Sequence, residues 1–94
     1  MANIEFTKEG NKYVSSILTG DDNGCIAFQV GFNTDGAKLS VDFTLDESLG
    51  WSNKAVILCP RMPELYGDII TGVGEGIKVR LRTNKKPAVA VINE

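Results

Sequence analysis

The sequence predicts an all-β protein, built as an antiparallel two-sheet sandwich of about eight short strands. Three stretches carry this prediction, because apolar and polar residues alternate along residues 26–32, 39–45 and 77–82. Successive side chains of an extended strand point to opposite faces, so this alternation gives each strand one apolar and one polar face. No stretch shows the i, i+3, i+4, i+7 spacing of a long amphipathic helix.

The expected strands lie at residues 3–7, 12–18, 25–32, 38–45, 54–59, 69–73, 77–83 and 88–92. Turn-forming residues separate them, among them Asn23-Gly24 and Asp35-Gly36, which tolerate the positive φ of tight turns. Short strands at such close intervals favour a sandwich of immunoglobulin-like or jelly-roll type, with a small closed barrel as the alternative. One helical turn fits residues 63–67, where Pro63 suits the first helical position and Gly67 the end.

Length and composition predict one domain, spanning residues 1–94, with a single core. The chain has 94 residues, of which 43 % are hydrophobic, and it carries 10 cationic against 12 acidic side chains. A net charge of −2 provides no general attraction to nucleic acid or to an anionic membrane. The first six residues include Glu5 and lead into no apolar signal-peptide core. The longest apolar run, residues 55–59, is far shorter than a membrane span, so we expect a cytoplasmic protein.

No catalytic, cofactor or metal site is predicted. The chain has no histidine, and histidine is the commonest general base and metal ligand. The acidic turn at residues 21–24 lacks the spacing of a calcium loop, so a plain hairpin turn is the better interpretation. Cys25 and Cys59 are not spaced to hold zinc. We expect two reduced, buried thiols, with a disulfide between strands as the alternative.

Two expected strands are apolar at consecutive positions, residues 55–59 and 88–92. Each would place apolar side chains on both faces, whereas a strand of a lone two-layer sandwich has one face toward water. The outer side chains would then form a docking surface for a protein partner or for copies of the same chain. The residues expected to make it are Val56, Leu58, Val89 and Val91.

The loop at residues 60–68 offers a different cover for these strands. It contains Met62, Leu65 and Tyr66, which would face inward and shield the second apolar face. The docking hypothesis and the loop hypothesis both stay open at the level of sequence.

Lys78, Arg80 and Arg82 lie on one face of the expected strand at residues 77–83. They form a solvated face that discourages edge pairing, or else a row that orients an acidic protein partner. The pattern argues against binding to nucleic acid, because no aromatic residues lie between the cations to stack on bases.

The alternative function is that of a small ligand-binding module, with carbohydrate as the expected ligand. Trp51 and Tyr66 are the residues expected to bind it. An exposed aromatic ring can stack on a sugar, whereas a lone tryptophan in a small sandwich more often caps the core. An exposed Trp51 beside a polar groove would favour sugar binding, and a buried one would favour the cap.

The first fourteen residues, MANIEFTKEGNKYV, comprise an expected strand, a Gly-Asn turn and a second strand. This opening resembles that of small β-rich virion-associated proteins of phages and prophages. The resemblance implies a non-enzymatic part that docks on a capsid, a fibre or a neighbouring copy, in the cytoplasm or on the virion. We therefore predict a structural or interaction protein and no enzyme.

Overall fold

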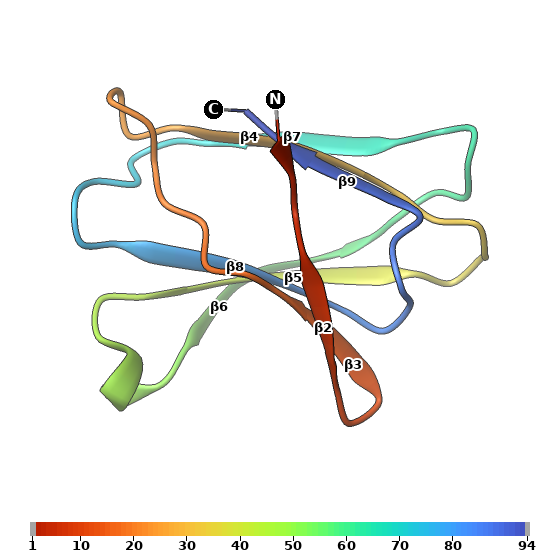
Figure 1. The fold of residues 1–94 in the computed structure, drawn as a ribbon, viewed down its shortest axis with the longest axis horizontal. Coiled ribbons are helices and arrows are strands. Elements are labelled where there is room, and N and C mark those ends of the chain that lie inside the picture. Colours follow the sequence, from red (N-terminus) through yellow and green to blue (C-terminus); the bar gives the residue numbers. More distant parts are fainter. Residues whose placement is uncertain (1, 94) are drawn as a thin grey trace.

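The computed structural model describes residues 2–93 and confirms the antiparallel two-sheet sandwich (Figure 1). Sheet A has four strands, in the order β1 (Ala2–Asn3), β9 (Val89–Ile92), β4 (Ile26–Gly31) and β7 (Tyr66–Ile70). Sheet B has five strands, in the order β2 (Phe6–Glu9), β3 (Lys12–Ser15), β8 (Lys78–Thr83), β5 (Lys38–Thr44) and β6 (Ser52–Leu58). Among the described residues, no helix has the length and apolar character needed to cross a membrane.

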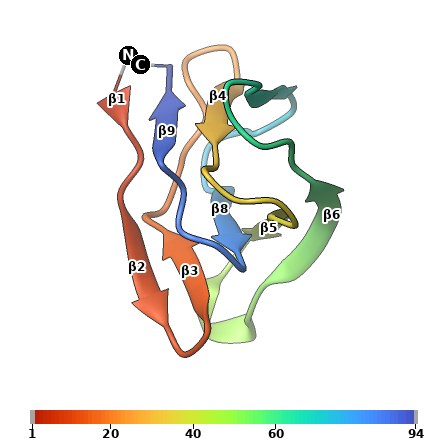
Figure 2. The same ribbon diagram turned by 90° about the vertical axis from the view of Figure 1, so that its right-hand side faces the viewer.

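The strands pair in a nested order. β1 and β2 are successive parts of one N-terminal segment, which passes from sheet A to sheet B at Ile4 and Glu5 (Figure 2). This first segment pairs with the last strand, β9, while β3 pairs with β8, β4 with β7 and β5 with β6. Such nesting, as if one long hairpin were rolled up, is the strand order of a jelly roll. It selects the jelly roll from the two sandwich types that the sequence predicts.

The core lies between the sheets and includes the inward side chains of the alternating stretches, together with Ile4, Leu18, Ala37, Cys59, Ile70 and Val73 from other segments. Burial removes these apolar groups from water, which is the main force that holds the two layers together. The inward residues of the three central strands are Ile26, Phe28 and Val30 of β4, Leu39 and Val41 of β5, and Val79 and Leu81 of β8.

Two details of the predicted elements are wrong. The strand expected at residues 3–7 is divided between β1 and β2, because the chain changes sheets there. The helical turn expected at residues 63–67 does not form, since Tyr66 and Gly67 pair with β4 as the start of β7. The short 3₁₀ helix is instead Glu47–Leu49, where the Asp46 carboxylate accepts a hydrogen bond from the Ser48 amide at 3.0 Å and caps the helix.

Candidate interaction surfaces

The structure divides the predicted docking residues between two opposite outer faces. Val56 lies opposite Ser40, and Ser40 lies opposite Arg82, so β6 and β8 present these side chains on the same outer face of sheet B. Val89 and Val91 lie on the outer face of sheet A, opposite Gly31 and Gln29 of β4. The whole predicted set therefore cannot form a single surface. The predicted docking residues on sheet B are Val56, Leu58, Lys78, Arg80 and Arg82.

The cationic row on sheet B is paired with acids of the same chain. Asp42 on β5 accepts hydrogen bonds from Arg82 Nε at 2.7 Å and Arg80 Nε at 3.2 Å. Lys78 Nζ lies 2.9 Å from a carboxylate oxygen of Glu47. These acids neutralise much of the row, which weakens its capacity to attract an acidic partner.

Asp42 is a residue that the site analysis of the sequence missed. It is 2 % exposed, although it lies on the outer face, because the arginine side chains and Asn53 surround it. Asn53 Nδ2 donates to Asp42 Oδ1 at 3.0 Å. The alternation along residues 39–45 places Asp42 on the polar face, and this was the one available signal for its role.

The pKa of Asp42 reflects two opposing effects. Burial alone would raise the pKa of this carboxyl, since it disfavours the charged form. Hydrogen bonds from Arg82, Asn53 and Arg80 outweigh burial and hold the pKa below its ordinary value of 3.8. Asp42 is therefore ionised at neutral pH, and the arrangement is a charge cluster that ties β5, β6 and β8 together.

Trp51 covers this cluster from outside. The Arg80 guanidinium carbon lies 4.4 Å from the centre of the Trp51 ring, within the range of a cation–π interaction. Because Arg80 points outward from sheet B, the prediction that Trp51 caps the core is wrong. Tyr66 packs instead beside Phe28 of sheet A, with ring centres 6.1 Å apart. Trp51 precedes β6 of sheet B, whereas Tyr66 begins β7 of sheet A, so the two rings do not form a common sugar-binding surface.

The outer edge of β6 carries unpaired main-chain groups. Within residues 2–93, β6 pairs with β5 alone. The Cys59 amide donates to the Ala37 carbonyl at 2.8 Å, one residue beyond the last β5–β6 pair. Antiparallel strands alternate between bonded and non-bonded pairs, so Ile57 also bonds toward β5. It follows that Val56 and Leu58 direct their N–H and C=O groups away from the sheet.

The same two residues expose their side chains. Val56 is 61 % exposed and Leu58 is 69 % exposed, on the outer face of sheet B. A β-bulge at Lys54, opposite the step from Val41 to Asp42, bounds the regular segment on one side. Pro60, which has no N–H, bounds it on the other. We call this segment, with the outward groups of Val56 and Leu58, the β6 edge.

The neighbouring edge strand, β7, differs from β6 in its main-chain groups. Ile69 exposes 65 % of its surface, but its amide donates to Oδ1 of Asp68 at 2.8 Å. The Asp68 side chain thereby occupies the Ile69 N–H, which an incoming strand would need for its own hydrogen bond. Charged residues that block an edge in this way are a common protection against unwanted pairing.

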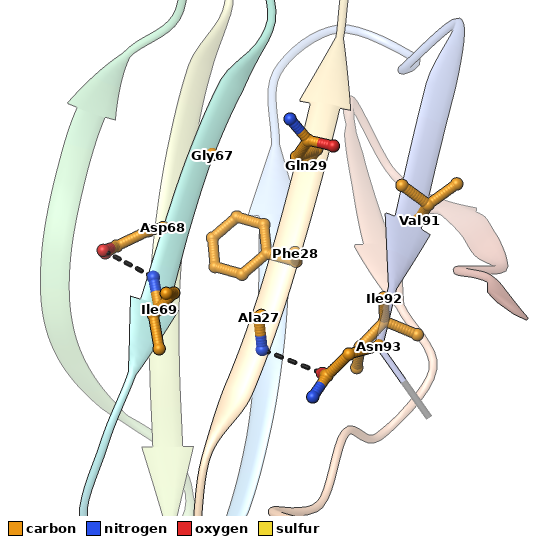
Figure 3. Close-up of a pocket in the computed structure, with 9 residues that line it drawn as sticks. All are labelled: Ala27, Phe28, Gln29, Gly67, Asp68, Ile69, Val91, Ile92 and Asn93. Atoms are coloured by element: carbon orange, nitrogen blue, oxygen red, sulfur yellow. Dashed lines mark hydrogen bonds between the residues drawn. The ribbon is translucent and has the colours of Figure 1, made fainter. Parts of the chain in front are cut away.

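A shallow hollow of about 810 Å³ lies on the outer face of sheet A (Figure 3). Figure 3 shows Gln29, Ile69 and Val91 around it, from three neighbouring strands. Two of its polar side chains already have partners, since Asn93 Oδ1 accepts from the Ala27 amide at 2.9 Å and Asp68 accepts from Ile69. The hollow is therefore a largely apolar surface and offers little that would orient a small polar ligand.

The loop at residues 60–68 covers sheet A rather than β6. A Cβ atom on Gly31 would meet Leu65 and Met62, so both side chains lie over this glycine, opposite Val89 in the register. The loop thus lies over the end of β4 at Gly31. The prediction that the loop shields the apolar strands is wrong for β6, where Val56 and Leu58 stay exposed.

The thiols and the acidic turn complete the predicted features. Both cysteines are free in the structure, with Cys59 buried and Cys25 half-buried.

Asp21 Oδ1 accepts hydrogen bonds from the amides of Asn23 and Cys25, each at 2.9 Å, which forms a tight turn. The turn leads into β4 of sheet A from a segment bridged to sheet B at Leu18, so it is not a hairpin. Within the described chain, no group of three or more potential ligands could hold a metal ion.

Comparisons with protein-family models, with curated proteins and with solved structures found no match.

Proposed function

We propose that this chain is a non-enzymatic interaction protein that docks through the β6 edge, by adding a strand of another polypeptide chain to sheet B. The observation that carries the proposal is that Val56 and Leu58 expose side chains and main-chain groups at the same edge. In recognition of this kind, main-chain hydrogen bonds give affinity and the alternate side chains give specificity.

The strength of such a contact can be estimated. Burying the two exposed side chains contributes roughly 1.5–3 kcal/mol each, and four new main-chain hydrogen bonds contribute about 1 kcal/mol each. Association itself costs about 4–15 kcal/mol. The β6 edge alone therefore supports weak binding, which becomes strong where many copies are held close together and the effective concentration is high.

A weak contact at the edge suits a component of a repetitive assembly better than a soluble one-to-one binder. The resemblance of the N-terminal stretch to virion-associated proteins agrees with such a role, and we propose a phage-type structural component. The jelly-roll order adds no independent support, because one fold serves many functions.

The test is site-specific photo-crosslinking in the cell that naturally makes the protein. A photoreactive aromatic residue replaces Leu58 in one variant and Ile69 in another, since both side chains are exposed at a sheet edge. We expect discrete polypeptide adducts from position 58 and few from position 69. Adding Val56→Pro, which removes an outward N–H without touching the bonds to β5, should abolish the adducts at position 58.

Two results would overturn the proposal. One is the absence of any polypeptide adduct at position 58 in folded protein. The other is a set of adducts that Val56→Pro leaves unchanged, since these would come from side-chain proximity without strand addition.

A further inference from the structure

We propose that the strand that occupies the β6 edge is β6 of a second copy of this chain, antiparallel, with the two-fold axis beside Ile57. This inference rests on the proposed function and names the partner. It requires an edge that is complementary to itself, because a two-fold contact brings the same residues together from both copies.

The main-chain groups meet this requirement. Lys54 at the bulge and Pro60 at the end of the segment are each three residues from Ile57. Pairing centred on Ile57 therefore places Val56 of each copy opposite Leu58 of the other. These are the residues whose N–H and C=O groups point outward, so both pairs form hydrogen-bonded pairs of an antiparallel ladder.

The side chains agree with the same register. In this register, Leu58 of one copy lies beside Val56 of the second copy. Within each chain, Leu58 is flanked on its other side by Lys38 of β5, and Val56 is flanked by Ser40 of β5. The four exposed apolar side chains form one cluster, and the two Lys38 side chains lie in different rows on opposite sides of it. Pairing centred on Val56 would instead place Leu58 opposite Lys54, which leaves an apolar side chain against a charged one.

The other sheet edges are less suited to this contact. On β7, Asp68 occupies the Ile69 amide. The edge of β2 carries exposed Lys8 and Glu9, and charged edge residues oppose pairing. The β6 edge lacks such a group between Lys54 and Pro60.

The register is tested by disulfide formation. In a background with Cys25→Ser and Cys59→Ala, one preparation carries Val56→Cys and another carries Leu58→Cys. Opposed residues of a hydrogen-bonded pair have Cα atoms about 5.5 Å apart, within the range that a disulfide spans. We expect a covalent dimer when the two preparations are mixed and oxidised, and little from either alone. A disulfide dimer from Val56→Cys alone would place the axis at residue 56 and overturn the inference.

The association itself is tested by sedimentation equilibrium of the wild-type chain over rising concentration. We expect the average mass to rise toward twice that of one chain. Val56→Pro and, as a second disruption, Leu58→Lys should hold it at one chain with an unchanged circular dichroism spectrum. Leu49→Lys, at a side chain 83 % exposed on the 3₁₀ helix, is the matched control and should still dimerise.

A wild-type chain that stays monomeric at every concentration would refute the self-pairing. If the photoreactive residue at position 58 then still reaches a different polypeptide, the proposed function stands and only the identity of the partner is wrong. If the chain stays monomeric and position 58 also gives no polypeptide adduct, the proposed function is wrong as well.

Discussion

The carboxylate of Asp42 lies 2.7 Å from Nε of Arg82 and is almost entirely hidden on the outer face of sheet B. Arg80 approaches the same oxygen at 3.2 Å, and Trp51 covers Arg80. The polar face of the central strands is therefore a connected cluster that holds three strands in register.

Replacing Asp42 by Asn should lower the free energy of unfolding by roughly 2–4 kcal/mol, because two neighbouring arginines lose the charge that neutralises them. Urea denaturation followed by the fluorescence of Trp51 measures the loss. Glu47→Gln is the control, since it removes the partner of Lys78 in an exposed ion pair and should cost at most about 1 kcal/mol. Equal losses in the two variants would contradict the special role of Asp42.

The contribution of Asp42 should depend on pH in a defined direction. Its pKa in the folded protein lies below the ordinary 3.8, so the folded state binds this proton less readily than the unfolded chain. The stabilisation is complete at pH values above the unfolded pKa and is lost as the pH falls through the folded pKa. We expect the stability difference between wild type and Asp42→Asn to be constant near neutral pH and to shrink below about pH 4.

Urea titrations of both proteins across this pH range give the difference directly. Asp46, whose pKa is also lowered by hydrogen bonds from Ser48, is present in both chains, and its effect cancels. A difference that stays constant down to pH 2 would show that Asp42 acts without its charge.

Gly20→Ala should destabilise the fold by about 1–3 kcal/mol, through overpacking. A Cβ atom at Gly20 would meet the carbonyl oxygen of Val73, and the main chain there cannot yield as a flexible side chain would. Gly74→Ala is the matched control, because a Cβ at Gly74 meets nothing within 4 Å. Thermal melting of both variants separates the two cases, and similar melting temperatures would argue against the close approach of Gly20 and Val73.

The two thiols should differ in reactivity. Burial raises the pKa of the Cys59 thiol above its ordinary 9.0, which leaves little of the nucleophilic thiolate at pH 8. We expect a disulfide reagent to modify Cys25 in the folded protein and Cys59 only after unfolding in urea. Cys25→Ser should abolish the early reaction and Cys59→Ala should leave it intact. Rapid modification of Cys59 in folded protein would contradict its burial.

The sequence predicts much of the fold because alternation is a local property. The pattern of residues 77–82 correctly places Val79 and Leu81 in the core and Arg80 on the outside. The positions of turns follow in the same way from Gly, Asn and Asp. Strand order does not, because it depends on contacts between residues far apart in the chain.

The candidate site could not be predicted in full, because it depends on strand order. Val56 and Val89 look alike in the sequence, yet they lie on opposite outer faces because β6 and β9 belong to different sheets. The pairing of Asp42 with Arg80 arises from the β5–β8 register, which no local pattern reveals. Trp51 follows a turn, and nothing in its neighbours indicates on which side of sheet B the ring lies.

The N-terminal segment that passes from one sheet to the other has a further consequence. It joins the two sheets along one flank of the sandwich, where β1 and β2 are short and β2 carries exposed Lys8 and Glu9. On the opposite flank, β6 forms a seven-residue edge with Val56 and Leu58 exposed. In the pairing that we propose, two copies join along these edges and cover each other's exposed side chains. The proposed pairing through β6 ends at two copies, because it leaves no second β6 edge free.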